Sequence, residues 1–341
     1  MNEQNEYLFF SKTYSFIEDY IPHTNGMTSC TKESYRDALG TFWTYVTDIK
    51  HLNIRKFSFS DCTYEFILNY RNWLIDDMKY APSTVNHRIV VIKAYVHYAA
   101  LCDVSLSQFD IIISKIPLLT IPKTILPVID NEKILSELFS RPKNTRIGRR
   151  DRLLMSMLFD TAMRVSELVK LTLRDVCVNI EIPYVRVNGK GRKQRIVGLC
   201  DRSVNLIKDY ILEYHAEYDL DSPFFYTEIH GQRNSMSIRN VQRVIQKYSQ
   251  ELKEDGYDIP DNVSPHMLRR TRATLLLQNG VSIFDVADIL GHSSAQTTSD
   301  HYARSSMKQK REMMNKATGN TTPAEQMWPD DMEEFKKRCG L

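Results

Sequence analysis

The pattern of apolar and polar residues in the first third of the chain predicts amphipathic helices joined by short turns. One helix is expected from about Thr31, which would cap it, to Ile49. Its inner face is predicted to carry Tyr35, Leu39, Phe42, Trp43 and Val46. A second helix is expected from about Cys62 to Met78. These elements favour a small helical bundle.

A third helix of this bundle is expected to begin after a cap at Ser83. Its buried stripe is predicted to contain Val85, Ile89, Ile92, Val96 and Ala99. Arg88 and Lys93 lie outside that stripe, so their side chains are expected to point toward solvent. Beyond this helix the periodicity stops in IPLLTIPKTILP, which contains Pro117, Pro122 and Pro127. Because a proline-spaced stretch stays extended, a semi-rigid linker and a domain boundary are expected there.

The pattern after the linker predicts a mixed α/β region. Helices are expected near Asp130 to Phe139 and from about Arg149 to Asp160, and a further helix is expected through Ser166-Glu167-Leu168 to Leu171. By its spacing, Glu167 can orient a neighbouring arginine. A strand pair is then predicted, with Tyr184 to Val187 leading to the turn signal Asn188-Gly189 and Arg195 to Leu199 returning. Lys190 would lie on that turn, where a solubilising edge lysine is the alternative interpretation.

Two helices are predicted near the C-terminal end of this region. Ser264 and Pro265 suit the start of a helix that reaches Gln278, on which His266 and Arg269 share one face. Asn279-Gly280 would end it, and Ser282 with Asp285 resembles a capping box for the next helix. The apolar stripe of that helix is predicted to be Ile283, Val286, Ala287 and Leu290.

Gly291 is expected to end this second helix and to leave His292 at its terminus. Ser293 and Ser294 can cap a third helix, with Tyr302 near its far end. Taken singly, an HxxR pair on a helix is more often a surface or capping pair, and a lone tyrosine is more often half-buried packing. Their joint occurrence in one short span indicates a site able to bind and transfer a phosphate.

Composition narrows the class of protein. A chain of 341 residues with 42% hydrophobic residues is expected to form two folded domains. No apolar run reaches membrane-spanning length, and the N-terminus lacks the pattern of a signal peptide, so a soluble intracellular protein is expected. The cysteines lack paired CxxC spacing and are interpreted as reduced thiols: Cys30, Cys62, Cys102, Cys177, Cys200 and Cys339.

The net charge of +3 is too small to identify a partner, but the basic residues are clustered. The clusters run from Arg141 to Arg152, from Lys190 to Arg195 and from Arg269 to Arg272. Ordinary solvated faces are one interpretation of such runs. Their position beside the motifs above favours a surface that meets phosphate.

In these motifs the chain resembles the tyrosine recombinase (phage-integrase) family. The matching segments are DTAMRVSELVKL with Arg164, VRVNGKGRKQRIVGL with Lys190, HMLRR with His266 and Arg269, LGHSS with His292, and TTSDHYAR with Tyr302. The resemblance is strong from about Asp130 to Arg304 and weak in the N-terminal third. Two departures are visible: Ala162 stands where the family motif usually has glycine, and His301 precedes the nucleophile position.

The resemblance implies a mainly α fold, in which a helical core-binding (SAM-like) domain precedes a mixed α/β catalytic domain with a small antiparallel β-sheet. The expected ranges are residues 1–116 for the DNA-binding domain, 117–127 for the linker, 128–310 for the catalytic domain and 311–341 for a C-terminal tail. The tail either docks on a neighbouring protomer or is a frayed terminus. DNA-facing basic residues are expected at Arg88, Lys93, Arg192, Lys193, Arg270 and Arg272.

The resemblance also assigns roles to six catalytic residues. Arg164 and Arg269 would grip the nonbridging phosphate oxygens, because guanidiniums bind oxyanions bidentately and stay charged. Tyr302 would attack the phosphodiester, and His266 would accept or relay its proton, because a phenol with a pKa near 10 is a poor nucleophile at neutral pH. Lys190 would protonate the leaving 5′-oxygen, and His292 would donate a hydrogen bond to the phosphate.

The implied reaction breaks and rejoins DNA strands through a 3′-phosphotyrosyl intermediate, without ATP, metal or other cofactor. No P-loop or HExxH motif is present, although scattered carboxylates leave a metal-dependent nuclease possible. The implied partners are double-stranded DNA with inverted-repeat sites, further copies of the chain in a tetramer on two sites, and accessory DNA-bending factors, in a prokaryotic cytoplasm and nucleoid. The alternatives are a type IB topoisomerase-like enzyme and a noncatalytic DNA-binding relative.

Overall fold

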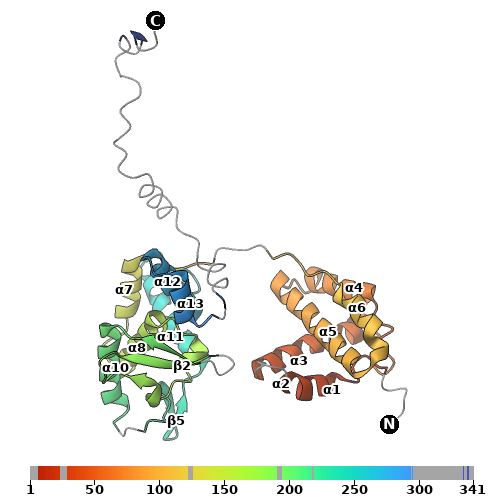
Figure 1. Cartoon of the computed structure of the whole chain (residues 1–341), viewed down its shortest axis with the longest axis horizontal. Coiled ribbons are helices and arrows are strands. Elements are labelled where there is room, and N and C mark those ends of the chain that lie inside the picture. The colour runs from red at the N-terminus through yellow and green to blue at the C-terminus, as the bar shows by residue number, and fades with distance from the viewer. Residues whose placement is uncertain are drawn as a thin grey trace. The chain divides into compact units, whose positions relative to one another are not determined.

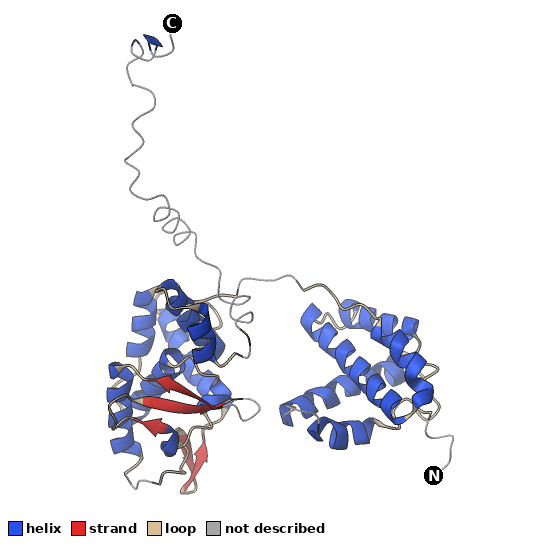
Figure 2. Ribbon diagram, viewed as in Figure 1, coloured by secondary structure: helices blue, strands red, loops and turns tan. Residues whose placement is uncertain are grey.

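The computed structural model describes residues 7–23, 29–121, 126–189, 194–216 and 219–292, together with residues 294, 333, 336 and 337. The chain divides into two compact units, Met1–Ile125 and Leu126–Leu341. In Figure 1 the first unit is red to orange and the second is yellow to blue, and Figure 2 shows the described strands in the second unit. The predicted mainly helical fold with a small antiparallel sheet is confirmed.

The N-terminal unit is a bundle built around one long helix, α5. Its helical segments are α1 (Thr13–Ser15), η2 (Phe16–Tyr20), α2 (Ile21–His23), α3 (Ser29–Thr44), η3 (Tyr45–Ile49), α4 (Tyr64–Asp76), α5 (Pro82–Cys102), η4 (Val104–Leu106) and α6 (Ser107–Ser114). The segments η2 and η3 are π-helical turns, and η4 is a 3-10 turn. Helix α5 packs against α3, α4 and α6. All five residues of its predicted stripe are fully buried, which confirms that prediction.

Aromatic side chains fill much of the core of this bundle. The ring of Phe9 lies 5.3 Å from Phe42, 5.0 Å from Phe59 and 5.3 Å from Tyr95, measured between centroids. The hydroxyl of Tyr95 donates a hydrogen bond to the carbonyl of Phe9, so its polar end is satisfied although the ring is buried. The segment before α1 is therefore part of the core.

The prediction that Arg88 faces solvent is wrong. Its side chain is buried, and Nη2 donates to Oδ2 of Asp37 on α3 at 2.8 Å. Lys93 is half-buried, and its Nζ donates to the carbonyls of Ser114 and Ile116 at 2.9 and 2.6 Å. The apolar stripe did not reveal these contacts because α5 has neighbours on several sides, so residues outside the stripe also meet other elements.

Trp43 is also placed differently from the prediction. It is 44% exposed, because the buried face of α3 and η3 is centred on Ala38, Phe42 and Tyr45. The indole lies at the rim of that face, against Phe10. The helix starts differ as well: α3 begins at Ser29, before Thr31, and α5 begins at Pro82 with Ala81 as its cap. Proline fits the first position of a helix, which makes a cap at Ser83 unnecessary.

The C-terminal unit is organised around α8. Its helical segments are α7 (Glu132–Ser140), α8 (Arg146–Asp160), α9 (Val165–Leu168), η5 (Leu173–Asp175), α10 (Asp201–Tyr214), α11 (Ile238–Glu254), α12 (Pro265–Gln278) and α13 (Ile283–Leu290). Helix α8 packs against α7, α10, α11 and α12. It starts three residues earlier than predicted, where the Thr145 hydroxyl accepts from the amide of Gly148. Helix α9 stops short of the predicted end at Leu171.

Two antiparallel sheets complete this unit. The first contains β1 (Val176–Cys177), β2 (Tyr184–Asn188) and β3 (Gln194–Gly198) in that order. Strands β2 and β3 form the predicted hairpin, with Val187 opposite Arg195 and Asn188 opposite Gln194. The second is a hairpin of β4 (Tyr226–Ile229) and β5 (Gln232–Ser235), which the sequence patterns did not indicate.

The two helices predicted near the C-terminal end are confirmed, with Ser264 and Ser282 as their N-caps; of the two hydrogen bonds of the predicted Ser282–Asp285 capping box, the one to the Ser282 hydroxyl is present. The Ser264 hydroxyl accepts from the amide of Met267 at the start of α12, and the Ser282 hydroxyl accepts from the amide of Asp285 at the start of α13. Gly291 ends α13 in the left-handed conformation, with φ +62°. Of the predicted stripe of α13, Val286, Ala287 and Leu290 are buried and Ile283 is half-buried.

The described parts of the predicted linker are held at each end by the adjoining unit. The Asn86 side chain on α5 exchanges two hydrogen bonds with the backbone of Leu119, at 2.9 and 2.7 Å. In the C-terminal unit, Arg270 on α12 donates to the carbonyl of Pro127 at 3.1 Å, and just beyond the linker the amide of Ile129 donates to the buried Thr271 hydroxyl on α12 at 3.0 Å. Among the described residues, no helix is long and apolar enough to cross a membrane. Five of the six cysteines are described, and their thiols are free; Cys339 lies outside the described residues.

Candidate active site

The corner between α8 and α9 places Arg164 at the edge of the candidate site. Ala162, at this corner, has φ +48°, in the left-handed region that favours glycine. Its side chain is fully buried with Ala273, Val286 and Leu290. Arg164 follows at the N-cap position of α9, and about a third of its side chain is exposed. The corner therefore directs the backbone so that the guanidinium emerges from the core.

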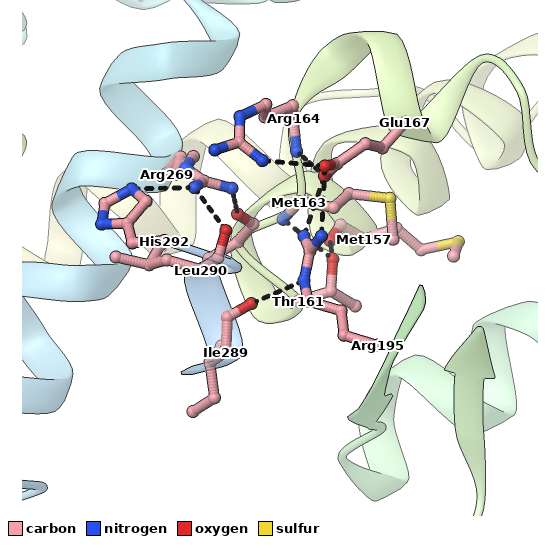
Figure 3. Close-up of polar contacts among 11 residues, drawn as sticks. Met157, Thr161, Met163, Arg164, Glu167, Arg195, Arg269, Ile289, Leu290 and His292 are labelled. Atoms are coloured by element: carbon pink, nitrogen blue, oxygen red, sulfur yellow. Dashed lines mark hydrogen bonds and ion pairs between the residues drawn. The ribbon is translucent and has the colours of Figure 1, made fainter. Parts of the chain in front are cut away.

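Glu167 on α9 holds two arginines together. Its carboxylate accepts from the amide and Nη1 of Arg164, at 2.7 and 2.9 Å, and from Nη1 and Nη2 of Arg195, at 3.1 and 2.8 Å (Figure 3). Burial alone would raise the pKa of Glu167, but the hydrogen bonds and charges of Arg195 and Arg164 outweigh burial and hold that pKa below its ordinary value. Glu167 therefore orients Arg164, as its spacing predicted, and it also binds Arg195.

Arg269 on α12 lies in the interior and joins three segments. It is 4% exposed, and its guanidinium donates to the carbonyls of Ala162 and Leu290, both at 2.6 Å, and to Nε2 of His292 at 3.2 Å (Figure 3). The guanidinium is therefore fixed between the α8–α9 corner and the end of α13. A buried charge with this set of acceptors keeps one orientation.

The left-handed turn at Gly291 brings His292 to Arg269. Because a guanidinium only donates, Nε2 of His292 accepts, and the ring proton is carried by Nδ1. A Cβ at position 291 would lie 2.8 Å from Nη1 of Arg195 and 3.1 Å from its Cδ, so the Arg195 side chain would have to leave its present position. The glycine is thus required by its backbone conformation and by the close approach of Arg195.

His266 lies at the start of α12, one helical turn before Arg269. Its side chain is exposed in part, and desolvation together with the positive charges of Arg269, Arg270 and Arg164 lowers its pKa. The imidazole is consequently neutral at neutral pH and able to accept a proton.

The structure brings four predicted residues together: Arg164, His266, Arg269 and His292. Lys190 and Tyr302, together with Arg192 and Lys193, lie outside the described residues. Arg270 donates to the carbonyl of Pro127 at 3.1 Å, and the guanidinium of Arg272 lies over the Phe159 ring. Within the described part of the chain, no group of three His, Cys, Asp or Glu residues is placed to hold a metal ion.

Arg195 is a component of this site that the sequence interpretation missed. Its Nε donates to the carbonyl of Ile289 at 3.0 Å, while the rest of the guanidinium contacts Glu167, and the side chain is 10% exposed. A signal was present in the strand pattern: Arg195 is in phase with the buried Val197, whereas the apolar Ile196 between them is 64% exposed. An arginine on the inward face of a strand indicates an internal ion pair.

The basic run from Arg141 to Arg152 makes contacts within the C-terminal unit. Arg149 forms two hydrogen bonds with Glu213, Arg141 pairs with Asp255, and the guanidinium of Arg146 lies 4.5 Å from the centre of the Tyr214 ring. These contacts tie the start of α8 to neighbouring helices. The interpretation of this run as a phosphate-binding surface stays a prediction.

Sequence comparison matches both units to known families. Residues 130–309 match the phage integrase family, and residues 12–105 match the phage integrase SAM-like domain. A tyrosine recombinase of Agathobacter rectalis is 31% identical over 251 residues, which is 70% of this chain and 78% of that protein. Tyrosine recombinase XerD of Staphylococcus aureus is 30% identical over 310 residues, which is 88% of this chain and 97% of that protein.

Structural comparison finds the same fold in recombinases solved with DNA. The XerH site-specific recombinase in a post-cleavage complex with palindromic difH substrate superposes with a TM-score of 0.67 at 19% identity, over 88% of this chain and 83% of that chain. The Tn1549 transposon integrase in complex with circular intermediate DNA superposes with a TM-score of 0.63 at 16% identity, over 89% of this chain and 98% of that chain. At these identities the likeness shows the fold alone.

Proposed function

This chain belongs to the phage integrase family of tyrosine recombinases, and from that premise we propose that it is a site-specific recombinase that cleaves and rejoins DNA strands. The observations that carry the proposal are that Arg269 contacts His292 and the carbonyl of Ala162, two residues before Arg164, and that His266, one turn before Arg269, has a pKa lowered by desolvation and by the charges of three arginines. A binding protein without catalysis would not need a proton acceptor there.

The arginines supply the charge that a phosphoryl transfer needs. As the phosphodiester is attacked, negative charge grows on the nonbridging oxygens, and preorganised guanidiniums stabilise it without reorientation. Arg269 is already fixed by the carbonyls of Ala162 and Leu290, and Arg164 by Glu167. Because Arg164 is the more exposed of the two, it offers the more accessible contact to a phosphate. The Nδ1–H of His292 is suited to donate a third hydrogen bond.

The proton transfers are assigned to His266 and Lys190. The Tyr302 hydroxyl attacks phosphorus and forms the 3′-phosphotyrosyl bond as the bond to the 5′-oxygen breaks. His266 takes the phenolic proton, because its lowered pKa leaves the imidazole in the neutral form that can accept one, and Lys190 gives a proton to the 5′-oxygen. The covalent link preserves the energy of the phosphodiester, so a 5′-hydroxyl from another strand can reverse the step. The proposed reaction therefore needs neither ATP nor a metal ion.

We assign residues 128–310 to catalysis, residues 117–127 to the linker and residues 1–116 to DNA binding. The match to a phage integrase SAM-like domain and the XerD relative that spans most of both chains favour recombination between two duplexes over topoisomerase-type relaxation. The proposed substrate is double-stranded DNA with inverted repeats, bound by four copies on two sites with the help of DNA-bending factors. The role is integration or transposition of a mobile element, or resolution of joined DNA, in the cytoplasm.

Covalent capture tests this function directly. The purified chain is incubated without metal with a pool of randomised, nicked duplexes whose short cut fragment diffuses away, and the products are separated on denaturing gels. The wild-type chain is expected to form a protein–DNA adduct, and sequencing of the adduct gives the preferred site. Tyr302→Phe should abolish the adduct, and Arg164→Ala should reduce it strongly.

Three results would contradict the proposal. Binding on native gels without any adduct would support a noncatalytic protein. An adduct that persists in Tyr302→Phe would mean that another residue is the nucleophile. Adduct formation with relaxation of supercoiled plasmid, but without exchange between two duplexes that carry the captured site, would instead indicate a topoisomerase-type enzyme.

A further inference from the structure

Arg195 on β3 contacts α9 and α13, two elements of the candidate site. The β2–β3 hairpin, to which Arg195 belongs, also carries Lys190 in its connecting segment. Arg195 donates through Nε to the carbonyl of Ile289 on α13 and through Nη1 and Nη2 to the carboxylate of Glu167 on α9. We infer that Arg195 is a positioning residue for strand cleavage, which holds Arg164, the β2–β3 hairpin and His292 in one arrangement. This inference rests on the proposed function.

Each contact leads to a proposed catalytic residue. Glu167 binds the amide and guanidinium of Arg164, so the position of its carboxylate sets the position of that guanidinium. Ile289 lies three residues before His292, in the last turn of α13, and the carbonyl of its neighbour Leu290 holds Arg269. Arg195 itself pairs with Val187 at the described end of the hairpin that continues into Lys190. Helix α13 also packs against β3.

The charges around Glu167 support the same inference. Glu167 is 6% exposed, and its one negative charge is shared between two guanidiniums. With Arg195 present, the three groups carry a net positive charge, and the charge of Arg164 is only partly offset. Without Arg195, the carboxylate would be neutralised by Arg164 alone, and less positive charge would remain for the phosphate. Arg195 therefore affects both the position of the Arg164 guanidinium and the positive charge that it can offer to the phosphate.

The shape of the arginine matters as well as its charge. One planar guanidinium serves two acceptors on different elements, at angles that an ammonium on a flexible stem cannot reproduce. The guanidinium and Cδ also lie against Gly291, with no space for a Cβ between them. A lysine at position 195 keeps the charge but loses the fixed distance between α9 and α13.

The test is single-turnover cleavage of a nicked duplex that carries the captured site, measured over a range of DNA concentrations. Arg195→Lys and Arg195→Ala are compared with the wild-type chain, and Arg174→Lys is the matched control. Arg174 also makes a two-point ion pair with a carboxylate in the same unit, that of Asp221, but none of its described contacts is with the candidate site. Thermal unfolding of each variant shows whether it is folded.

We expect Arg195→Lys to lower the cleavage rate at saturating DNA by roughly 10- to 100-fold, as small displacements of catalytic groups do, and Arg195→Ala to lower it further. The DNA concentration for half-maximal rate should change by less than about twofold, because a positioning residue acts on the chemical step and not on DNA binding. Arg174→Lys should cleave at the wild-type rate even if its thermal stability falls.

Two outcomes overturn the inference while the wild-type chain still forms its adduct. One is a wild-type cleavage rate in a folded Arg195→Lys variant. The other is a loss that disappears at saturating DNA, which would make Arg195 a DNA ligand. If Arg195→Ala does not fold, Arg195→Lys decides alone. A wild-type chain that forms no adduct would refute the proposed function instead, so the two failures are distinguishable.

Discussion

Ala162 shows how a single residue can combine an unfavourable backbone with favourable packing. Its left-handed conformation costs roughly 1–2 kcal/mol relative to a glycine-like position. Its methyl group is fully buried with Val286 and Leu290, and its carbonyl holds Arg269. The sequence showed this position as a departure from a family motif. The structure shows that, with alanine at this position, the carbonyl of residue 162 accepts a hydrogen bond from Arg269.

We expect Ala162→Gly to change the free energy of unfolding by less than about 1 kcal/mol, because relief of backbone strain is offset by lost burial and by the greater entropy of the unfolded chain. Ala162→Val should destabilise by at least about 2 kcal/mol, because a β-branched residue resists positive φ and the site is already filled. Urea unfolding measures the free energy of unfolding of both variants. A glycine variant much more stable than the wild-type chain would show that backbone strain at Ala162 is not offset by the burial of its methyl group.

The pH dependence of cleavage follows from the lowered pKa of His266. In the proposed mechanism the neutral imidazole accepts the proton, so the cleavage rate should fall as pH decreases through the pKa of His266. Because desolvation and three neighbouring positive charges lower that pKa, the half-maximal point should lie below 6.5, the ordinary value. A pH–rate profile under single-turnover conditions measures it.

A pair of variants tests the cause of this shift. Arg270→Gln removes one of the charges that act on His266 and should move the acid limb to higher pH. Arg272→Gln is the matched control, because its guanidinium lies over Phe159 and is not among the groups that lower this pKa. An acid limb above pH 6.5 in the wild-type chain, or equal shifts in both variants, would count against His266 as the acceptor.

At the scale of elements, signals local to the chain predicted the site helices well. The caps at Ser264 and Ser282 and the left-handed glycine at position 291 depend on adjacent residues only, so they can be read from the sequence. The surroundings of Arg88 and Arg195 depend on which elements pack beside them. The periodicity of α5 does not contain that information, which is why Arg88 was misplaced. The alternation of β3 places Arg195 on the same face as the buried Val197, but it does not identify Glu167 or Ile289 as its partners. The β4–β5 hairpin was missed because its turn, His230-Gly231, is a weaker signal than Asn-Gly.

Thr271 ties the chain before α7 to α12 through one buried hydrogen bond. In Thr271→Val the shape is kept, but the amide of Ile129 loses its acceptor, so the free energy of unfolding of the C-terminal unit should fall by about 1–3 kcal/mol. Thr227→Val on β4 is the control, because its hydroxyl makes only a long 3.5 Å contact with the carbonyl of Asn234. Equal stability of the two variants in urea would show that the Ile129 contact contributes nothing.

At the scale of the whole molecule, the described chain has a separate hydrophobic core in each unit. The aromatic N-terminal core and the core around α8 could both be anticipated from apolar periodicity and the intervening prolines. The placement of Lys190 and Tyr302 could not be compared with the prediction, because both lie outside the described residues. Their roles rest on the motif order and on the four partners that the structure does bring together.

We propose that the tail, residues 311–341, acts in assembly and not in chemistry. We expect deletion of residues 322–341 to leave cleavage of a single site unchanged and to weaken cooperative assembly on DNA with two sites, measured by titration on native gels. A Gly/Ser sequence of the same length is the control, because it keeps the chain length but removes Phe335 and Met332. Unchanged cooperativity in both variants would show that the tail plays no part in assembly.

The close approach of Arg195 to Gly291 has a consequence for how this site can change over evolutionary time. As long as position 195 carries an arginine, a substitution at 291 brings a collision at 2.8 Å in addition to an unfavourable backbone. A shorter residue at 195 removes the collision but leaves the buried Glu167 without one of its two counter-charges. The two positions are therefore coupled: a substitution at either one is expected to disturb the other, and descendants are expected to retain both residues or to replace the whole cluster together.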